Sequence, residues 1–183
     1  MNSEKALIEF FQNAGKLKNI KRTGWKLMGI KNPESVAEHS FRLAVMAFAL
    51  APRFGLDAEK CAVLALIHDL PEAYTGDISH AGVPGKQQIA NENKAMKKLI
   101  AKLEPKTKNG ILKLWNEFID EKSREAELIQ QLDKLEMALQ AFYYEKKKFT
   151  RRSLQVFFDD ANLQITDKRL LKMLHALNDM RSR

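Results

Sequence analysis

Two apolar segments, residues 35–53 and 58–68, constrain the fold of this chain more than any other part of the sequence. Both carry apolar residues at intervals of three and four, which predicts two α-helices. The first is apolar around much of its circumference, so we expect it to lie at the centre of the fold. His39 stands near its start, and the pair His68 and Asp69 stands at the end of the second segment. Such side chains need polar partners when they are buried, and a metal ion would supply that partner.

Helical patterns also cover most of the remaining chain. Residues 3–18 read as an amphipathic helix, whereas residues 19–34 contain two glycines and Pro33 and predict a loop or extended connection. No alternating pattern typical of a strand is found. The sequence therefore predicts an all-α fold, a helical bundle formed by one domain over residues 1–183. Its further helices are expected at residues 87–103, 107–122, 124–147, 153–162 and 167–181.

Composition narrows the class of protein. Cys61 is the only cysteine, which excludes an intrachain disulfide and a cysteine-based zinc site and favours a cytoplasmic setting. The longest apolar run, residues 43–52, is too short to cross a membrane, so we expect no membrane partner. The net charge of +8 favours anionic partners such as nucleotides. Nucleic acid is the less favoured partner, because the basic run at residues 146–152 has no interleaved aromatic residue other than Phe149.

A fourth candidate ligand comes from the helix predicted over residues 124–147. Its apolar residues recur at a spacing near 3.5 and form an inward-facing stripe: Leu128, Leu132, Leu135, Leu139 and Phe142. Asp133 lies between two of these leucines, near the edge of the buried face. Two histidines with two aspartates would offer nitrogen and oxygen ligands to a first-row divalent ion and leave positions for water and substrate.

The order of these residues is more specific than any of them alone. A single histidine on an apolar helix is usually a core or surface residue. The chain instead presents one histidine, then a His-Asp pair, then Asp133, and two more carboxylates, Glu72 and Asp77, follow the pair within nine residues. A loop predicted over residues 75–86, from three glycines and a proline, would form a wall or lid beside them. This order favours a metal site over a chance arrangement.

Four segments carry a resemblance to a known family. They are RTGW at residues 22–25, PESVAEHS at 33–40, LALIHDLPEAYTGDIS at 64–79 and QLDKLEMALQAFYYE at 131–145. Together they resemble the HD-domain phosphohydrolase superfamily, whose pattern is H…HD…D, and within it the 5′-deoxynucleotidase branch. The resemblance covers about residues 5–165. It implies a single HD domain with a central metal site, on which C-terminal helices over residues 153–181 would pack.

The resemblance implies one divalent metal ion per subunit, bound by His39, His68, Asp69 and Asp133. Manganese or cobalt is the expected ion, with zinc, nickel, iron and copper as alternatives. The resemblance also implies a homodimer, for which the apolar N-terminal and C-terminal helices are candidate interfaces.

The resemblance further implies which residues meet the substrate. Glu72 and Asp77 match the acidic residues that flank the phosphate and the attacking water, and either could act as the general base. Arg22 matches the arginine that grips the 5′-phosphate, a task for which the planar guanidinium is well suited. Trp25 matches a tryptophan that packs on the sugar and disfavours a 2′-hydroxyl.

We therefore expect a metal-dependent phosphomonoesterase that converts deoxyribonucleoside 5′-monophosphates to deoxynucleosides and phosphate. The divalent ion would polarise a phosphoryl oxygen and lower the pKa of its bound water. Two alternatives remain open at this point. One is another HD phosphohydrolase that acts on a nucleoside triphosphate, a cyclic nucleotide or a different phosphate ester. The other is a non-catalytic HD module that binds a nucleotide.

Overall fold

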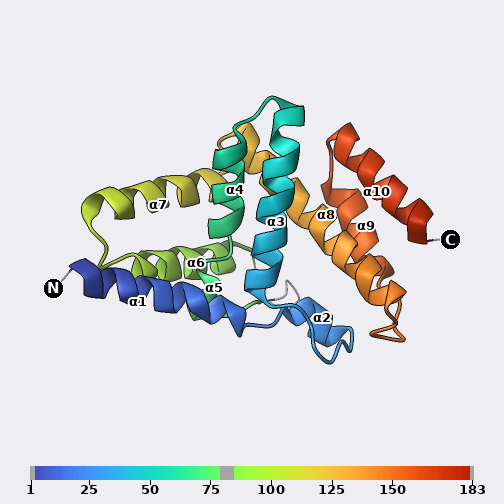
Figure 1. Cartoon of the computed structure of the whole chain (residues 1–183), viewed down its shortest axis with the longest axis horizontal. Coiled ribbons are helices and arrows are strands. Elements are labelled where there is room, and N and C mark those ends of the chain that lie inside the picture. The colour runs from blue at the N-terminus through green and yellow to red at the C-terminus, as the bar shows by residue number, and fades with distance from the viewer. Residues whose placement is uncertain (1–2, 79–84, 182–183) are drawn as a thin grey trace.

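The helices α3 and α4 cross the centre of the molecule, and the other helices lie around them (Figure 1). The structure, a computed structural model, describes residues 3–78 and 85–181. Over these residues it contains helices and no strand beyond one isolated bridge, which confirms the all-α prediction. The helices are α1 (Ser3–Gly15), α2 (Thr23–Leu27), α3 (Val36–Leu50), α4 (Ala58–Ile67), α5 (Glu72–Thr75), α6 (Gly85–Leu99), α7 (Pro105–Ile119), α8 (Arg124–Lys146), α9 (Gln155–Gln164) and α10 (Lys168–Arg181), with 3₁₀ turns η1 (Lys16–Lys18) and η2 (Ala51–Phe54). Residues 79–84 of the predicted loop lie outside the described residues.

The central helix pair begins and ends at residues with clear local roles. Ser35 caps α3: its Oγ accepts a hydrogen bond from the backbone N–H of Glu38, and the Glu38 side chain accepts one from the N–H of Ser35. Gly55 adopts a φ of +66° after η2, in the left-handed region that glycine tolerates best. Asp57 then caps α4 by accepting the N–H of Lys60 at 3.0 Å. The two caps begin α3 and α4, and the turn at Gly55 separates them. The two predicted segments therefore form two helices that lie side by side.

The long helix α8 packs against both central helices and against α9 and α10. Leu128, Leu132 and Leu135 are buried as the predicted stripe requires, but Leu139 and Phe142 are only partly buried. A strict spacing of 3.5 drifts around a helix that has 3.6 residues per turn. The C-terminal half of α8 therefore buries a different set of side chains: Ala138, Ala141 and Tyr144.

The connection predicted over residues 19–34 is partly wrong, because it contains the short helix α2. Sequence patterns identify single-turn helices poorly, since tertiary contacts decide them. Gly24 of α2 packs closely against α9, where an added Cβ would meet the Phe157 ring at 3.6 Å. Lys21 forms an antiparallel bridge with Ser35. The bridge and the helix together hold residues 19–34 against the start of α3.

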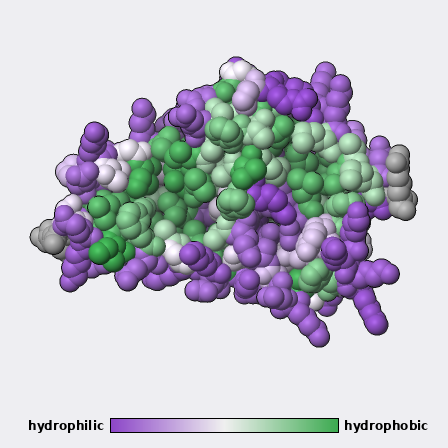
Figure 2. All heavy atoms as spheres, in the orientation of Figure 1, coloured by the Kyte–Doolittle hydropathy of each residue, from purple (hydrophilic) through white to green (hydrophobic). Residues whose placement is uncertain are grey.

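One face of the central pair is apolar and exposed. Phe41 and Phe48 of α3 expose 68% and 56% of their surface. We call this surface the α3–α4 apolar face; it consists of Phe41, Val45, Phe48, Val63 and Leu66. Figure 2 shows hydrophobic side chains gathered over this part of the molecule. The prediction that α3 is central holds, but its apolar circumference does not mean burial on every side. No helix among the described residues is long and apolar enough to cross a membrane.

Removing the α3 cap should destabilise the protein. We expect Ser35→Ala to lower the free energy of unfolding by about 1–2 kcal/mol, because it leaves the backbone N–H of Glu38 without its acceptor. Urea denaturation followed by circular dichroism would measure the loss. Asp57→Ala, which removes the exposed cap of α4, provides a matched comparison and should have the smaller effect. A Ser35→Ala variant as stable as the wild type would contradict the assigned role of the cap.

Candidate active site

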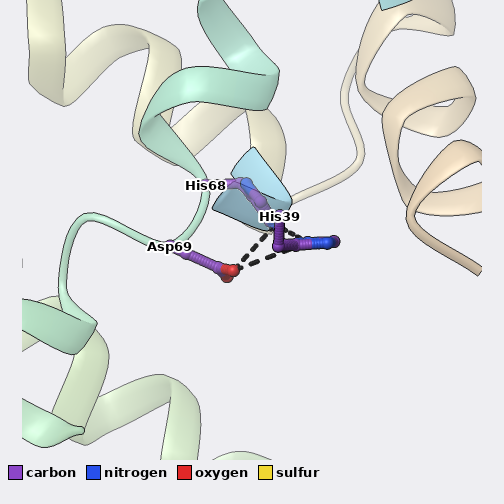
Figure 3. Close-up of side chains that lie close together, drawn as sticks. All are labelled: His39, His68 and Asp69. Atoms are coloured by element: carbon purple, nitrogen blue, oxygen red, sulfur yellow. Dashed lines mark hydrogen bonds and ion pairs between the residues drawn. The ribbon is translucent and has the colours of Figure 1, made fainter. Parts of the chain in front are cut away.

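His39, His68 and Asp69 meet where α3 and α4 lie side by side. His39 is near the start of α3, and His68 follows the last residue of α4. Their Nε2 atoms lie 3.4 Å apart. Asp69 Oδ2 lies 3.1 Å from His68 Nε2 and 3.7 Å from His39 Nε2, and Figure 3 shows Asp69 pointing toward both histidines. Their ligand atoms are close enough to bind one metal ion.

Asp133 joins this group from α8. Its Oδ1 lies 3.1 Å from His39 Nε2, although this buried oxygen accepts no hydrogen bond from any residue the structure describes. The side chain is 19% exposed, because Asp133 stands at the edge of the buried face of α8. The structure thus brings ligand atoms of His39, His68 and Asp69 within 4.8 Å of one another and places Asp133 against His39.

The hydrogen bonds behind the two histidines decide which nitrogen faces this point. His68 Nδ1 lies 2.8 Å from the carbonyl oxygen of Ala65, and His39 Nδ1 lies 2.7 Å from Glu136 Oε2. Both contacts require Nδ1 to donate, so a neutral ring has its lone pair on Nε2. Two nitrogen lone pairs then face each other and two carboxylates. A divalent ion fits this set of donors.

The electrostatics of the site indicate the same need for positive charge. Burial and Arg22 lower the pKa of His39, but Glu136 and Asp133 raise it more, to about 10. Burial raises the pKa of Asp69, but His68 and His39 lower it to about 2. In metal-free protein a proton on His39 therefore provides the charge that a metal ion would otherwise bring.

Arg22 and Asp77 lie beside the candidate ligands and contact each other. Arg22 Nη1 lies 3.3 Å from Asp69 Oδ2, and Arg22 Nε lies 3.8 Å from Asp77 Oδ1. Burial lowers the pKa of Arg22, but Asp69, Asp133 and Asp77 raise it above its usual range, so the guanidinium stays charged. Thr23 donates hydrogen bonds to Asp77 from its backbone N–H and, at 2.7 Å, from its hydroxyl. These bonds attach the start of α2 to the segment after α5.

Glu72 differs from the other carboxyl groups of the site. It is the first residue of α5, and its Oε2 is buried with no hydrogen-bond partner among the described residues. Burial raises its pKa, and the negative charges of Asp69 and Asp77 raise it further, to about 11. Without a cation nearby, Glu72 therefore holds its proton at neutral pH.

Trp25 is more deeply buried than a residue that stacks openly on a ligand. It is 1% exposed, and its Nε1 donates a 3.0 Å hydrogen bond to Glu34. Its ring lies between Tyr144 and Phe157, at centroid distances of 5.3 and 4.0 Å. Trp25 contributes to the wall of the cavity beside the candidate ligands, but most of its surface contacts other side chains.

A cavity of about 570 Å³ opens beside the candidate ligands, within the size range of small-molecule sites. Arg22, Asp69 and Glu72 line its polar part. Residues that sequence reasoning did not assign to the site line other parts: Gln88 and Ile89 of α6, Phe118 and Ile119 of α7, and Val156, Phe157 and Asp160 of α9. A signal for α9 was present in the adjacent phenylalanines Phe157 and Phe158, because neighbouring helical residues point in different directions.

Comparison with known proteins identifies the family of this chain. The HD domain family model matches residues 14–173. The chain therefore belongs to the HD domain family, as the order of its histidines and aspartates predicted.

Two named relatives and one solved structure are also similar to this chain. The 5′-deoxynucleotidase HDDC2 of Homo sapiens is 34% identical over 179 residues, which cover 97% of this chain and 87% of the relative. The protein of the same name from Dictyostelium discoideum is 37% identical over 163 residues, 83% of this chain and 86% of the relative. A Magnetospirillum magnetotacticum crystal structure described as a predicted metal-dependent phosphohydrolase superposes with a TM-score of 0.77 at 29% identity, covering 99% of this chain and 93% of that one.

Divalent metal should stabilise the protein through this site. At about 100 times Kd, a bound ligand adds about 2.7 kcal/mol, which should raise Tm by roughly 5–10 °C for a chain of this size. Differential scanning calorimetry with Mn²⁺ would measure the rise, which His68→Ala should abolish. His175→Ala, a change at an exposed histidine of α10, should leave the rise intact. An equal rise in the His68→Ala variant would place the metal elsewhere.

Proposed function

We propose that this protein is a metal-dependent 5′-deoxynucleotidase that hydrolyses deoxyribonucleoside 5′-monophosphates. The observation that carries the proposal is the convergence of two histidine Nε2 atoms and two aspartates beside Arg22 in one cavity. The names of the curated relatives support the substrate class. His39, His68, Asp69 and Asp133 would bind one divalent ion, manganese or cobalt, which would polarise the phosphate and lower the pKa of the attacking water.

Arg22 would bind the phosphate of the substrate. Its guanidinium remains charged and lies 3.3 Å from Asp69, so a phosphate held by Arg22 would lie beside the ion. Arginine is suited to this role because its planar fork can donate two parallel hydrogen bonds to phosphate oxygens. Asp77 contacts Arg22 and accepts the Thr23 N–H. Asp77 would therefore hold Arg22 and the start of α2 in position around the phosphate.

Glu72 would move the proton at its Oε2 atom. Among the acidic residues of the site it combines a buried oxygen without a described partner with a strongly raised pKa. A bound cation would lower that pKa from about 11 toward neutrality, where a carboxyl group can both accept and donate protons. Glu72 could then take a proton from the attacking water and return one to the leaving 5′-oxygen.

Selectivity for deoxyribose would come from the apolar wall that Trp25 and Phe157 form. A ribose 2′-hydroxyl buried against these rings would lose its hydrogen bonds to water. An unsatisfied buried hydroxyl costs about 1–3 kcal/mol. Phe157 would provide most of the contact and Trp25 would support it from behind, because Trp25 is almost fully covered.

The alternatives predict different products or none. A hydrolase acting on nucleoside triphosphates would release pyrophosphate or triphosphate, and one acting on cyclic nucleotides would release a nucleoside monophosphate. A non-catalytic module would bind the ion without turnover. The presence of Glu72 and Asp77 beside a complete set of candidate ligands favours catalysis.

The proposal can be tested by measuring phosphate release from dAMP and from AMP. The protein would first be freed of metal and then resupplied with Mn²⁺, Co²⁺ or Zn²⁺. We expect metal-dependent release from dAMP and release slower by roughly 5- to 150-fold from AMP, the range equivalent to 1–3 kcal/mol. Colorimetric detection of inorganic phosphate would give both rates.

Two variants separate the site from a contaminating phosphatase. His68→Ala should abolish release, whereas His175→Ala should retain it.

Glu72→Gln keeps the shape of the side chain and should lower kcat by roughly 10²- to 10⁴-fold if Glu72 moves the proton. Equal rates with dAMP and AMP would keep the phosphatase and reject the sugar selectivity. No release from either substrate would reject the proposed activity.

We further propose that the protein forms a homodimer through the α3–α4 apolar face. This proposal moves the interface away from the N-terminal and C-terminal helices that the sequence suggested. The five side chains of the face are all apolar and 40–68% exposed, and contiguous exposed apolar surface on a soluble protein usually marks an interaction site. A two-fold axis would let the same face of a second copy cover it.

Phe48→Glu should therefore weaken the dimer, because it places a charge within an apolar interface, and Phe48 is nine residues from His39 along α3. Light scattering coupled to size-exclusion chromatography would measure the change from dimer to monomer. Leu163→Glu changes an apolar side chain of α9 that is 78% exposed and outside the face, so this variant should stay dimeric. A dimeric Phe48→Glu variant would contradict the proposed interface.

A further inference from the structure

Glu136 of α8 is a fully buried carboxylate that no part of the proposed reaction uses. It is 0% exposed and stands three residues after Asp133, close to one helical turn. Both of its oxygens are engaged. Oε2 accepts the 2.7 Å hydrogen bond from His39 Nδ1, and Oε1 accepts hydrogen bonds from Nε (2.7 Å) and Nη2 of Arg42. A buried carboxylate is tolerated only with such partners, so its contacts indicate its role.

Arg42 connects this carboxylate to the substrate side of the cavity. It lies three residues after His39 on α3, a spacing that places both side chains on neighbouring parts of one helix face. Its Nη2 also lies 3.5 Å from Glu34 Oε2, and the other oxygen of Glu34 accepts the Trp25 Nε1 hydrogen bond. A continuous chain of polar contacts thus runs from His39 through Glu136, Arg42 and Glu34 to Trp25.

Glu34, His39 and Glu136 resemble a second metal site, but the positive charge beside them comes from Arg42. Ligand atoms of Glu34, His39 and Glu136 all lie within 4.8 Å of one another. The guanidinium of Arg42 contacts both carboxylates of this group, and His39 Nδ1 is used by its hydrogen bond to Glu136. The group is therefore suited to orienting His39 and is not suited to binding another ion.

We propose that Glu136 and Arg42 are positioning residues that fix His39 for metal binding. Glu136 holds the proton of His39 on Nδ1 and thereby leaves Nε2 free to face His68, Asp69 and Asp133. The fork of Arg42 holds Glu136 and balances its charge. This proposal rests on the metal site of the proposed function. Carboxylates behind histidine ligands typically change metal affinity by 10- to 100-fold.

Glu136→Gln is the sharpest test, because the amide keeps the shape of the carboxylate but offers only one acceptor oxygen. If that oxygen faces His39, the NH₂ group faces the N–H donors of Arg42, and one of the two contacts is lost. We expect the Kd for Mn²⁺, measured by electron paramagnetic resonance of the free ion, to rise 10- to 100-fold. Arg42→Lys keeps the charge but replaces the fork with a single ammonium, so its Kd should rise by less.

A matched control separates positioning from a purely structural role. Gln140, also buried on α8 and four residues further along, makes no described contact with His39. Gln140→Met should therefore leave the Kd for Mn²⁺ unchanged even if it lowers Tm. An unchanged Kd in Glu136→Gln would overturn the inference while the metal site stands. Absence of Mn²⁺, Co²⁺ and Zn²⁺ binding to the wild type would instead reject the metal site, and the inference with it.

Discussion

The repulsion between electron pairs in the middle of the molecule is the constraint on which the rest of the site depends. The Nε2 atoms of His39 and His68 lie 3.4 Å apart, with Asp69 and Asp133 beside them. Such an arrangement has a high free energy in a buried place unless positive charge joins it. In the metal-free protein a proton on His39 and the nearby Arg22 provide that charge. In the proposed metal site a divalent ion would take the place of that proton and offset the repulsion.

The fold tolerates this arrangement because each ligand is held from behind by a different element. The capped start of α3 positions His39, the carbonyl of Ala65 in α4 orients His68, and α8 supplies Asp133. Packing of α8 against α3 and α4 brings these elements together. Stability and site geometry therefore depend on the same helix contacts. A change that loosens the packing of α8 would therefore also displace Asp133.

The metal-site candidates could be predicted from the sequence because their spacing and the apolar pattern of their helices are local properties. The wall of the cavity could not, because the position of Phe157 depends on how α9 packs on α8 and α10. Trp25 of α2 contacts Phe157 of α9, and a short helix held by such tertiary contacts leaves no periodic pattern in the sequence, so α2 was missed. Periodicity marked Phe41 as apolar but could not show whether protein or solvent covers it. The contact between His39 and Glu136 could not be predicted from the sequence either, since it joins residues 97 positions apart.

The charges of the site also explain why one of its carboxyl groups should be neutral. A divalent ion and Arg22 would bring three positive charges, and Asp69, Asp77 and Asp133 would bring three negative charges. A phosphate monoester that enters such a site adds further negative charge, so an ionised Glu72 would oppose its binding. Burial and the charges of Asp69 and Asp77 raise the pKa of Glu72 to about 11 and keep this group protonated before a cation arrives. In the proposed mechanism Glu72 would lose its proton only once a cation lies beside it, so its proton transfer would depend on the bound metal ion.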